Sequence, residues 1–379
     1  MVNHGIERSG LRSSWVHLIS LCLAVLFFGT GCESARFYAQ AISGQVELLS
    51  RRKSLKRLIR DEATPLVLKE RLMLVDRLVA FAHAELGLPD GGSYSSYVAL
   101  DRPYVAWNVA VSPEFDLAPK TWWYPIVGRL EHRGYFRKAS ADQFAQRMKR
   151  RGYDVAVGGV IAYSTLGWFR DPVLSTFVEL EETELAELIF HELAHELLFV
   201  DGDTDFNEAF AVTVAELGVR RWLLCQGDKE ALRTYAAQLA SRQVFMGLVH
   251  SLRCDLEAFY LGVAAENRES EDKLEYLRSQ KEAIIGEFRQ VYRAEVALDA
   301  RLAVYEGWIE SPINNAKVNV VDTYYRLIPF FRMMLDEQRS LEGFYRAVKE
   351  IGKRSKTERQ KRLGIKTVAE SGELLEDAG

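Results

Sequence analysis

The fold of this chain is decided by residues 182–224, which read ETELAELIFHELAHELLFVDGDTDFNEAFAVTVAELGVRRWLL. Within them His191, Glu192 and His195 form an HExxH pattern. Side chains four residues apart lie on one face of a helix, so both imidazoles can reach one cation at roughly 2.0–2.1 Å, while Glu192 is offset by one position. This spacing supplies two metal ligands and a general base, and it predicts a metallopeptidase.

The residues around the pattern indicate that it lies on a helix. Apolar residues recur at helical intervals, and they are Leu185, Ala186, Ile189, Phe190, Leu193, Ala194 and Leu197. A run with this period predicts an amphipathic helix. The alternative interpretation is two histidines and a glutamate on a solvated helix face.

A catalytic zinc ion needs a third protein ligand and an open position for water. Asp201 stands where peptidases with a longer motif carry that ligand, but those peptidases turn at a glycine, and this chain has Leu198 there. Leucine has no easy access to positive φ, which disfavours Asp201. Glu208 begins a second apolar-periodic segment after a turn, so an antiparallel helix would present it to the imidazoles. We expect Glu208 as the ligand; the alternative is a helix capping box, Asp205-x-x-Glu208.

Residues 1–31 are interpreted as a secretory signal. Arg8 and Arg12 precede an apolar run over residues 15–28, which is too short for a membrane-spanning helix. Small residues then lead into Cys32, as at a bacterial lipoprotein cleavage site. We expect lipidation of Cys32; the alternatives are an ordinary cleaved signal and an uncleaved anchor.

The expected location is the bacterial cell envelope. Acyl chains on Cys32 would hold the protein on a membrane surface facing the periplasm and leave the rest in solution. Glu33 follows the cysteine, and the absence of Asp there favours the outer membrane. The formal net charge of −4 and the pI of about 6.1 argue against a nucleic-acid partner. Nothing in the sequence indicates an oligomeric state.

The predicted fold class is α+β, mostly helical, with a small mixed β-sheet before the metal helix. Within a peptidase domain over residues 32–352, composition and periodicity predict a helical scaffold (34–88), a strand-rich part (91–180), the metal-site helices (182–224) and a helical C-terminal part (226–352). Polar and charged residues predict a disordered tail over 353–379.

Two strands are candidates for binding a substrate. Zinc peptidases commonly hold an extended peptide along a sheet edge beside the metal, and Val160–Thr165 or Ser175–Leu180 could form that edge. Either could equally be an ordinary buried strand. Tyr324 or Tyr325 could donate a hydrogen bond to the oxyanion that develops when water attacks a carbonyl, although both rings also suit core packing.

Recognition of a free substrate N-terminus requires a carboxylate, and the candidates are Glu179, Glu181 and Glu187. Solvation on a helix face explains each of them as well. The remaining cysteines of the mature chain are Cys225 and Cys254, which could form a disulfide or stay as thiols.

Several motifs together resemble a known family. They are LGLPDGGSY (86–94), RPYVAWN (102–108), RGYF (133–136), AYSTLGWFRDPVLSTF (162–177), IFHELAHELLF (189–199) and FNEAFA (206–211). They cover most of the mature chain and resemble the bacterial "putative aminopeptidase" family of membrane-anchored zinc peptidases. The resemblance implies a zincin-like fold of the gluzincin type, with Zn²⁺ bound by His191, His195 and Glu208 and with Glu192 as the base. Val212 departs from the thermolysin-like pattern, which has an Asp there to support a ligand histidine.

The sequence therefore predicts zinc-dependent hydrolysis of peptide bonds, by an aminopeptidase that acts on peptides in the cell envelope. One alternative is an endopeptidase with the same chemistry. The other is a noncatalytic envelope binding or scaffold protein that keeps zinc for structure.

Overall fold

A computed structural model describes residues 32–124, 128–162, 170–264, 271–323 and 326–363. The chain divides into two compact units, residues 1–51 and 52–379. The expected signal lies outside the described residues, and α2 (Cys32–Ser50) is the described part of the first unit. Among the helices that are described, none combines the length and the apolar character needed to cross a membrane.

The second unit is mostly helical and contains three small sheets, which confirms the predicted α+β class. Its helices are α3 (Leu55–Arg60), α4 (Leu66–Leu86), α5 (Lys138–Lys149), α6 (Glu182–Leu197), α7 (Thr204–Gln226), α8 (Lys229–Ala264), α9 (Glu271–Leu298), the 3-10 helix η1 (Ala300–Tyr305), α10 (Glu306–Glu310), α11 (Asn315–Asp322), α12 (Ile328–Gln338), α13 (Leu341–Gly352) and α14 (Lys356–Arg362). Its strands are β1 (Lys53–Ser54), β2 (Ser96–Val98), β3 (Ala106–Pro113), β4 (Trp122–Tyr124), β5 (Gly128–Leu130), β6 (His132–Tyr135), β7 (Tyr153–Val160) and β8 (Val173–Leu174).

The strands form separate sheets rather than the single mixed sheet that was predicted. The largest has the order β6-β3-β7 and is antiparallel throughout, with Val109 of β3 opposite Arg133 and Val157. The sheet β1-β2-β8 is mixed, because β2 pairs antiparallel with β1 and parallel with β8. The strands β4 and β5 form a hairpin of their own. Within the described residues β7 pairs along one side only, so it is an edge strand.

The prediction of a strand at Ser175–Leu180 is wrong. This segment forms consecutive turns directly after β8. Its backbone is held from outside the sheet, because Arg71 of α4 donates to the carbonyl oxygens of Val178, at 2.8 Å, and of Leu180. These hydrogen bonds fix the turns against α4.

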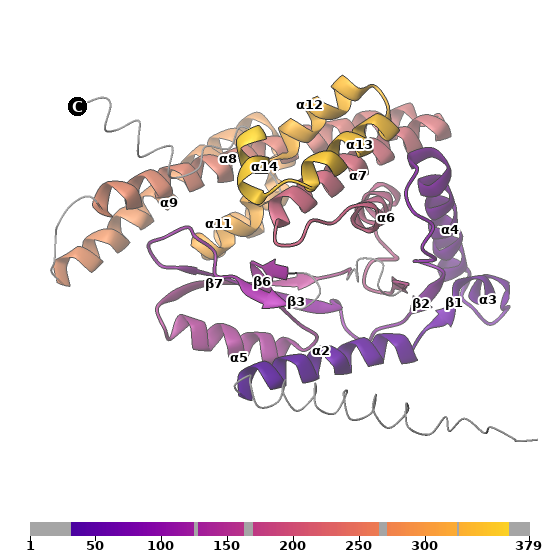
Figure 1. Ribbon diagram of the computed structural model, residues 1–379, viewed down its shortest axis with the longest axis horizontal. Helices are drawn as coiled ribbons and strands as arrows, with labels where there is room; N and C mark the ends of the chain where they lie inside the picture. Colours follow the sequence, from indigo (N-terminus) through magenta and orange to yellow (C-terminus); the bar gives the residue numbers. More distant parts are fainter. Residues whose placement is uncertain (1–31, 125–127, 163–169, 265–270, 324–325, 364–379) are drawn as a thin grey trace, which may run out of the picture. The chain divides into compact units, whose positions relative to one another are not determined.

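The helices α6 and α7 pack together at the centre of the second unit, with α4 against α6 and α12 against α7 (Figure 1). Their facing side chains are apolar and fully buried, as the helical period of the sequence predicted; they include Leu185, Ile189, Phe190, Ala209, Phe210 and Val214. Gly218 lets the two helices approach closely, since a Cβ there would lie 2.6 Å from the ring of Phe190.

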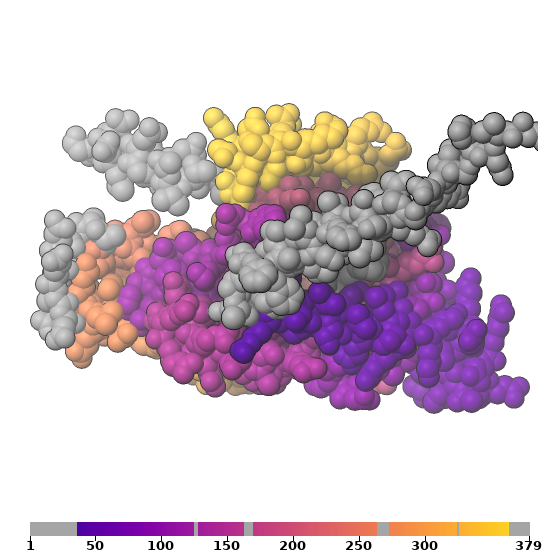
Figure 2. All heavy atoms as spheres, turned by 60° about the horizontal axis from the view of Figure 1, so that its bottom comes forward, coloured from indigo at the N-terminus to yellow at the C-terminus, as the bar shows by residue number. Residues whose placement is uncertain are grey.

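The prediction of a disordered tail from residue 353 is wrong for residues 356–362, which form α14. Ser355 and Glu358 make a capping box that satisfies the first turn of this helix. Arg359 is buried and pairs with Asp203 at 2.7 Å, so this one charge of the segment is neutralised rather than solvated. The C-terminal helices, in yellow, gather in one group in Figure 2. Residues 364–379 lie outside the described residues.

Candidate metal centre

His191 and His195 lie one turn apart on α6 and direct their Nε2 atoms to one point. The two Nε2 atoms are 3.1 Å apart. The side chain of His191 is 18% exposed and that of His195 is 6% exposed, so the pair is largely shielded from water. The alternative of a solvated helix face is therefore excluded.

Glu208 is brought to the same point by the connection between α6 and α7. The chain turns at Gly202, whose φ of 72° belongs to the left-handed region that glycine adopts without strain. The buried amide of Asn207 then accepts from the backbone N–H of Val200 at 2.8 Å and donates to its carbonyl at 2.8 Å. This two-point contact fixes the start of α7, and the next residue is Glu208.

The three side chains form a set with the geometry of a metal site. Glu208 Oε2 lies 3.3 Å from His191 Nε2, and Oε1 lies 3.7 Å from His195 Nε2. Around a tetrahedral zinc ion with bonds of roughly 2.05 Å, neighbouring ligand atoms lie about 3.3 Å apart. Two imidazole nitrogens and a carboxylate therefore fit such an ion, and no other group of three ligands converges in this way within the described residues.

The ionisation states of these three side chains also favour the binding of a cation. Burial lowers the pKa of His195 to about 4 against the pull of Glu208, so its imidazole is neutral and keeps a lone pair. Burial raises the pKa of Glu208, but the two histidines outweigh this and lower it to about 2. For His191, burial opposes protonation, yet the hydrogen bond and charge of Glu208 raise its pKa. The carboxylate is thus ionised across the physiological range.

The alternatives for Glu208 are excluded by its surroundings. The N-cap of α7 is Asp203, and no side chain caps this helix end, so the capping box that starts at Asp205 does not form. Asp205 instead pairs with Arg326. Asp201 is not a member of the converging group, as the leucine at the turn position had indicated.

No carboxylate supports His195 from behind within the described residues. Its Nδ1 atom is buried and makes no hydrogen bond within the described residues. Histidine ligands usually donate this N–H to a carboxylate or a carbonyl, which fixes their orientation. Here packing orients the ring instead, with Phe199 edge-on at 6.3 Å between ring centroids.

Glu192 and His191 line a cavity of about 790 Å³. The lining also includes Gly158, Gly159 and Val160, so the exposed end of the edge strand β7 and the metal helix border the same cavity. Of the two candidate edges, Val160–Thr165 overlaps β7 only at Val160, because the strand ends there and Ile161 and Ala162 lie outside it. The rest of that candidate, from Tyr163 onward, lies outside the described residues.

The sequence did not reveal the polar wall of this cavity. Arg242 of α8 pairs with Glu187, which also accepts from the hydroxyl of Tyr235 at 3.0 Å. Arg332 of α12 pairs with Glu216 of α7 at 2.6 Å. These partners lie far apart in the chain, so no local pattern could predict them.

The ion pairs and the lining of the cavity decide which carboxylate could bind the amine of a substrate. Glu187 is occupied by Arg242, while Glu179 and Glu181 do not line the cavity. Glu184, one turn before Leu188 on α6, lines the cavity and is exposed, and its side chain makes no ion pair within the described residues. It is the carboxylate of this wall that remains for a cation.

Two residues near the centre were missed as well. Tyr94 is buried, has a φ of 61° that non-glycine residues rarely adopt, and has its pKa raised by burial and then by Glu192. Burial lowers the pKa of His132 on β6, while the charge of Glu208 opposes that shift. The GGSY motif was the one available signal for Tyr94.

Five other residues singled out in the sequence have separate outcomes. Tyr324 and Tyr325 lie outside the described residues. Cys32 is the first residue of α2, and its lipidation stays a prediction. Cys225 and Cys254 are exposed free thiols, so a disulfide between them is excluded.

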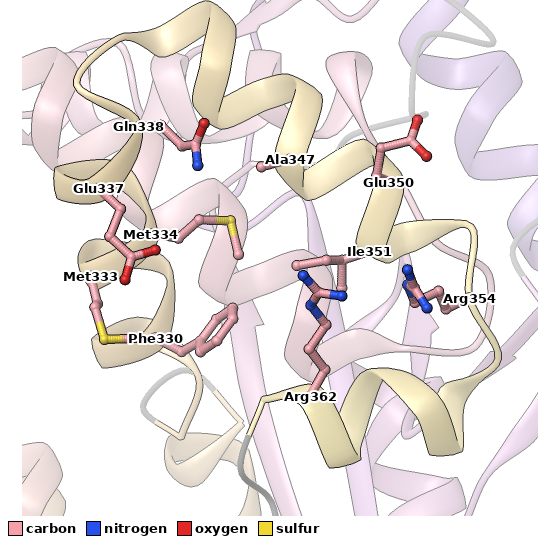
Figure 3. Close-up of a pocket in the computed structure, with 10 residues that line it drawn as sticks. All are labelled: Phe330, Met333, Met334, Glu337, Gln338, Ala347, Glu350, Ile351, Arg354 and Arg362. Carbon is pink, nitrogen blue, oxygen red and sulfur yellow. The ribbon is translucent and has the colours of Figure 1, made fainter.

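A smaller cavity of about 300 Å³ lies between α12, α13 and α14 (Figure 3). Phe330, Met334 and Ile351 provide apolar surface, and Arg354 and Arg362 lie on the side of α14. Among the described residues, its lining includes no histidine, cysteine or hydroxyl group. The larger cavity is therefore the candidate reaction site.

Comparison with known proteins gives one match. Residues 36–363 match a family model described as "Putative aminopeptidase", a description that implies peptidase activity. No curated protein and no solved structure matches the chain. The zincin-like fold therefore stays a prediction.

Proposed function

We propose that this chain, which belongs to the "putative aminopeptidase" family, is a zinc-dependent peptidase that removes residues from the free N-termini of peptides in the bacterial cell envelope. The observation that carries the proposal is the convergence of His191, His195 and Glu208 at one edge of a cavity that Glu192 also lines. When bound there, zinc would lower the pKa of a water molecule to about 7 and polarise the scissile carbonyl.

The protein's own residues supply the remaining chemistry. Glu192 accepts a proton from the attacking water and later delivers it to the leaving amine, so a peptide and water become a carboxylate and an amine. The backbone of β7 binds the substrate as an added strand, because the edge is unpaired within the described residues. A Cβ at Gly158 would meet no atom within 4 Å, so the face of the strand is open at this residue.

Cleavage at a free N-terminus needs a group that binds the substrate ammonium, and Glu184 is our candidate. It lies seven residues before His191, about 10 Å along a helix that rises 1.5 Å per residue. Glu187 and Glu216 line the same cavity, but arginines already neutralise them. Their pairing also favours the second candidate, an endopeptidase, if Glu184 plays no part.

Glu192→Gln tests the proposal. It removes the general base and keeps the size of the side chain, so we expect hydrolysis to fall about 10²- to 10⁴-fold with unchanged zinc content. Unchanged hydrolysis would place the activity elsewhere. If the native protein binds zinc but cleaves no peptide in a library, the noncatalytic scaffold is the correct function.

The choice between the two peptidases needs a separate measurement. Peptides of one sequence, with a free or an acetylated N-terminus, are digested and their products identified by mass spectrometry. We expect acetylation to abolish cleavage by an aminopeptidase and Glu184→Gln to raise the KM for free peptides. Equal cleavage of both peptides would establish the endopeptidase.

The envelope location has its own test. We expect Cys32→Ser to abolish metabolic labelling of the protein with a fatty acid and to release it from the membrane fraction. Normal labelling of the Cys32→Ser protein would exclude this anchor.

A further inference from the structure

A second group of side chains that could bind a metal lies on α8 and α11. Neither helix contributes a ligand to the α6 centre. Cys254 is exposed, and its Sγ atom lies 3.7 Å from Nε2 of His250, one turn earlier on the same helix. The other nitrogen of that ring, Nδ1, lies 2.6 Å from Oδ1 of Asp322 on α11. Nothing in the sequence motifs had pointed to these residues as a group.

Asp322 fixes the state of the histidine. Its carboxylate is 6% exposed and also pairs with Arg253 at 3.3 Å, so it is held in place. A neutral imidazole that donates its Nδ1–H to such a carboxylate carries its lone pair on Nε2, the atom that faces the thiol. This arrangement is the usual support of a metal-binding histidine.

The separation of the two atoms matches a shared metal ion. With a Zn–S bond of roughly 2.3 Å and a Zn–N bond of roughly 2.05 Å, tetrahedral geometry places sulfur and nitrogen about 3.6 Å apart. The observed 3.7 Å requires almost no adjustment of either side chain. Both groups can also be reached from solvent, since the side chain of His250 is 35% exposed.

A Cys–His–Asp sequence of contacts is also the arrangement of an activated thiol nucleophile. The local charges favour the cation instead. Asp255, Glu257 and Asp322 act on the thiol as negative charges, and Arg253 is the positive charge that opposes them. Three carboxylates against one guanidinium make the surroundings of the thiol net negative, which attracts a divalent cation.

We propose that Cys254 and His250 form a second, surface site for a borderline or soft divalent transition metal such as Zn²⁺, with Asp322 as the residue that orients the histidine. The protein supplies two ligands, and water completes the coordination. With two protein ligands rather than three, this site binds the metal more weakly than the α6 centre and loses it first to a chelator.

The test is the rate at which N-ethylmaleimide alkylates each thiol of the full chain, with and without Zn²⁺, read by peptide mass spectrometry. Cys225 is the matched control, because it is also an exposed free thiol on a helix. We expect Zn²⁺ to slow the alkylation of Cys254 and to leave that of Cys225 unchanged. His250→Ala should remove the protection, and Asp322→Asn should raise the half-protecting zinc concentration about 10- to 100-fold.

Several outcomes would overturn the proposal. They are a Cys254 that zinc does not protect, equal protection of both cysteines, and protection that survives His250→Ala. Alkylation of Cys254 that is fast without metal, insensitive to zinc and slowed by His250→Ala would instead identify a reactive thiol. The native chain with and without zinc decides the question even if a variant misfolds.

Discussion

Two helices of this protein each carry a histidine one turn from another metal-binding side chain, and they differ in what surrounds the pair. On α6, His191 and His195 are largely buried and meet Glu208 from the next helix. On α8, His250 and Cys254 lie at the surface, and the nearby carboxylate holds the histidine rather than facing the shared point. Helical spacing therefore creates a pair of ligands, while a third group and a cavity distinguish a candidate reaction centre from a surface site.

The largest expected effect comes from removing that third group. Glu208→Ala reduces the α6 centre to two ligands, as on α8, so we expect zinc affinity to fall by at least about 100-fold and hydrolysis to be lost. Metal analysis after dialysis and a peptide assay measure the two effects. Asp201→Asn is the control and should change neither, because Asp201 is not in the ligand group. Full zinc retention in Glu208→Ala would contradict the assignment of the third ligand.

The next effect concerns the turn that presents Glu208. Arg359 of α14 pairs with Asp203 just before α7, and both side chains are buried. Arg359→Ala leaves a buried carboxylate without its partner, so we expect a loss of about 3–5 kcal/mol in the free energy of unfolding. Denaturant titration measures this loss. Arg362→Ala on the exposed face of α14 is the control, and an equal effect of both changes would show that the ion pair is unimportant.

The contrast between these two arginines also shows which features of the structure could be predicted from the sequence and which could not. The HExxH pattern and the apolar period were enough to predict α6, α7 and the convergence of His191, His195 and Glu208, because helix spacing and a short connection are local properties. The role of Arg359 was not predictable, since its partner is 156 residues away and its neighbours are charged. The pairs of Glu187 with Arg242 and of Glu216 with Arg332 were missed for the same reason.

A smaller effect is expected from adding a methyl group to a helix glycine. Its sign should differ between the tight contact of α6 with α7 and the outer helix α9. A Cβ at Gly218 would lie 2.6 Å from Phe190 and 2.7 Å from Leu86, so we expect Gly218→Ala to cost about 1–3 kcal/mol. A Cβ at Gly286 of α9 would meet no atom within 4 Å, and Gly286→Ala should stabilise by about 0.5–1 kcal/mol through helix propensity. Thermal unfolding of the two variants should therefore shift in opposite directions; shifts of the same sign would contradict the difference in packing.

The last expected effect is a change in pH dependence near the start of α7. Burial raises the pKa of Glu131 to about 7, and the charges of Asp205 and Asp203 add to this against Lys356 and Arg326. The folded state holds this proton more tightly than the unfolded state, where the pKa is near 4.5. Stability from this group is therefore fully present below pH 4.5 and is lost as the pH rises through 7.

Glu131→Gln removes this dependence and adds no charge at any pH. We expect the variant to match the native protein at pH 4 and to exceed it in unfolding free energy at pH 8, as measured by denaturant titration at both values. The ligands on α6 and the pair on α8 are present in both proteins, so their own titrations cancel in the comparison. A variant that is less stable at pH 8 would mean that the Glu131 carboxylate is ionised and stabilising beside Lys356 and Arg326. Ion pairs would then stabilise the region around the start of α7, and burial of a neutral Glu131 would not.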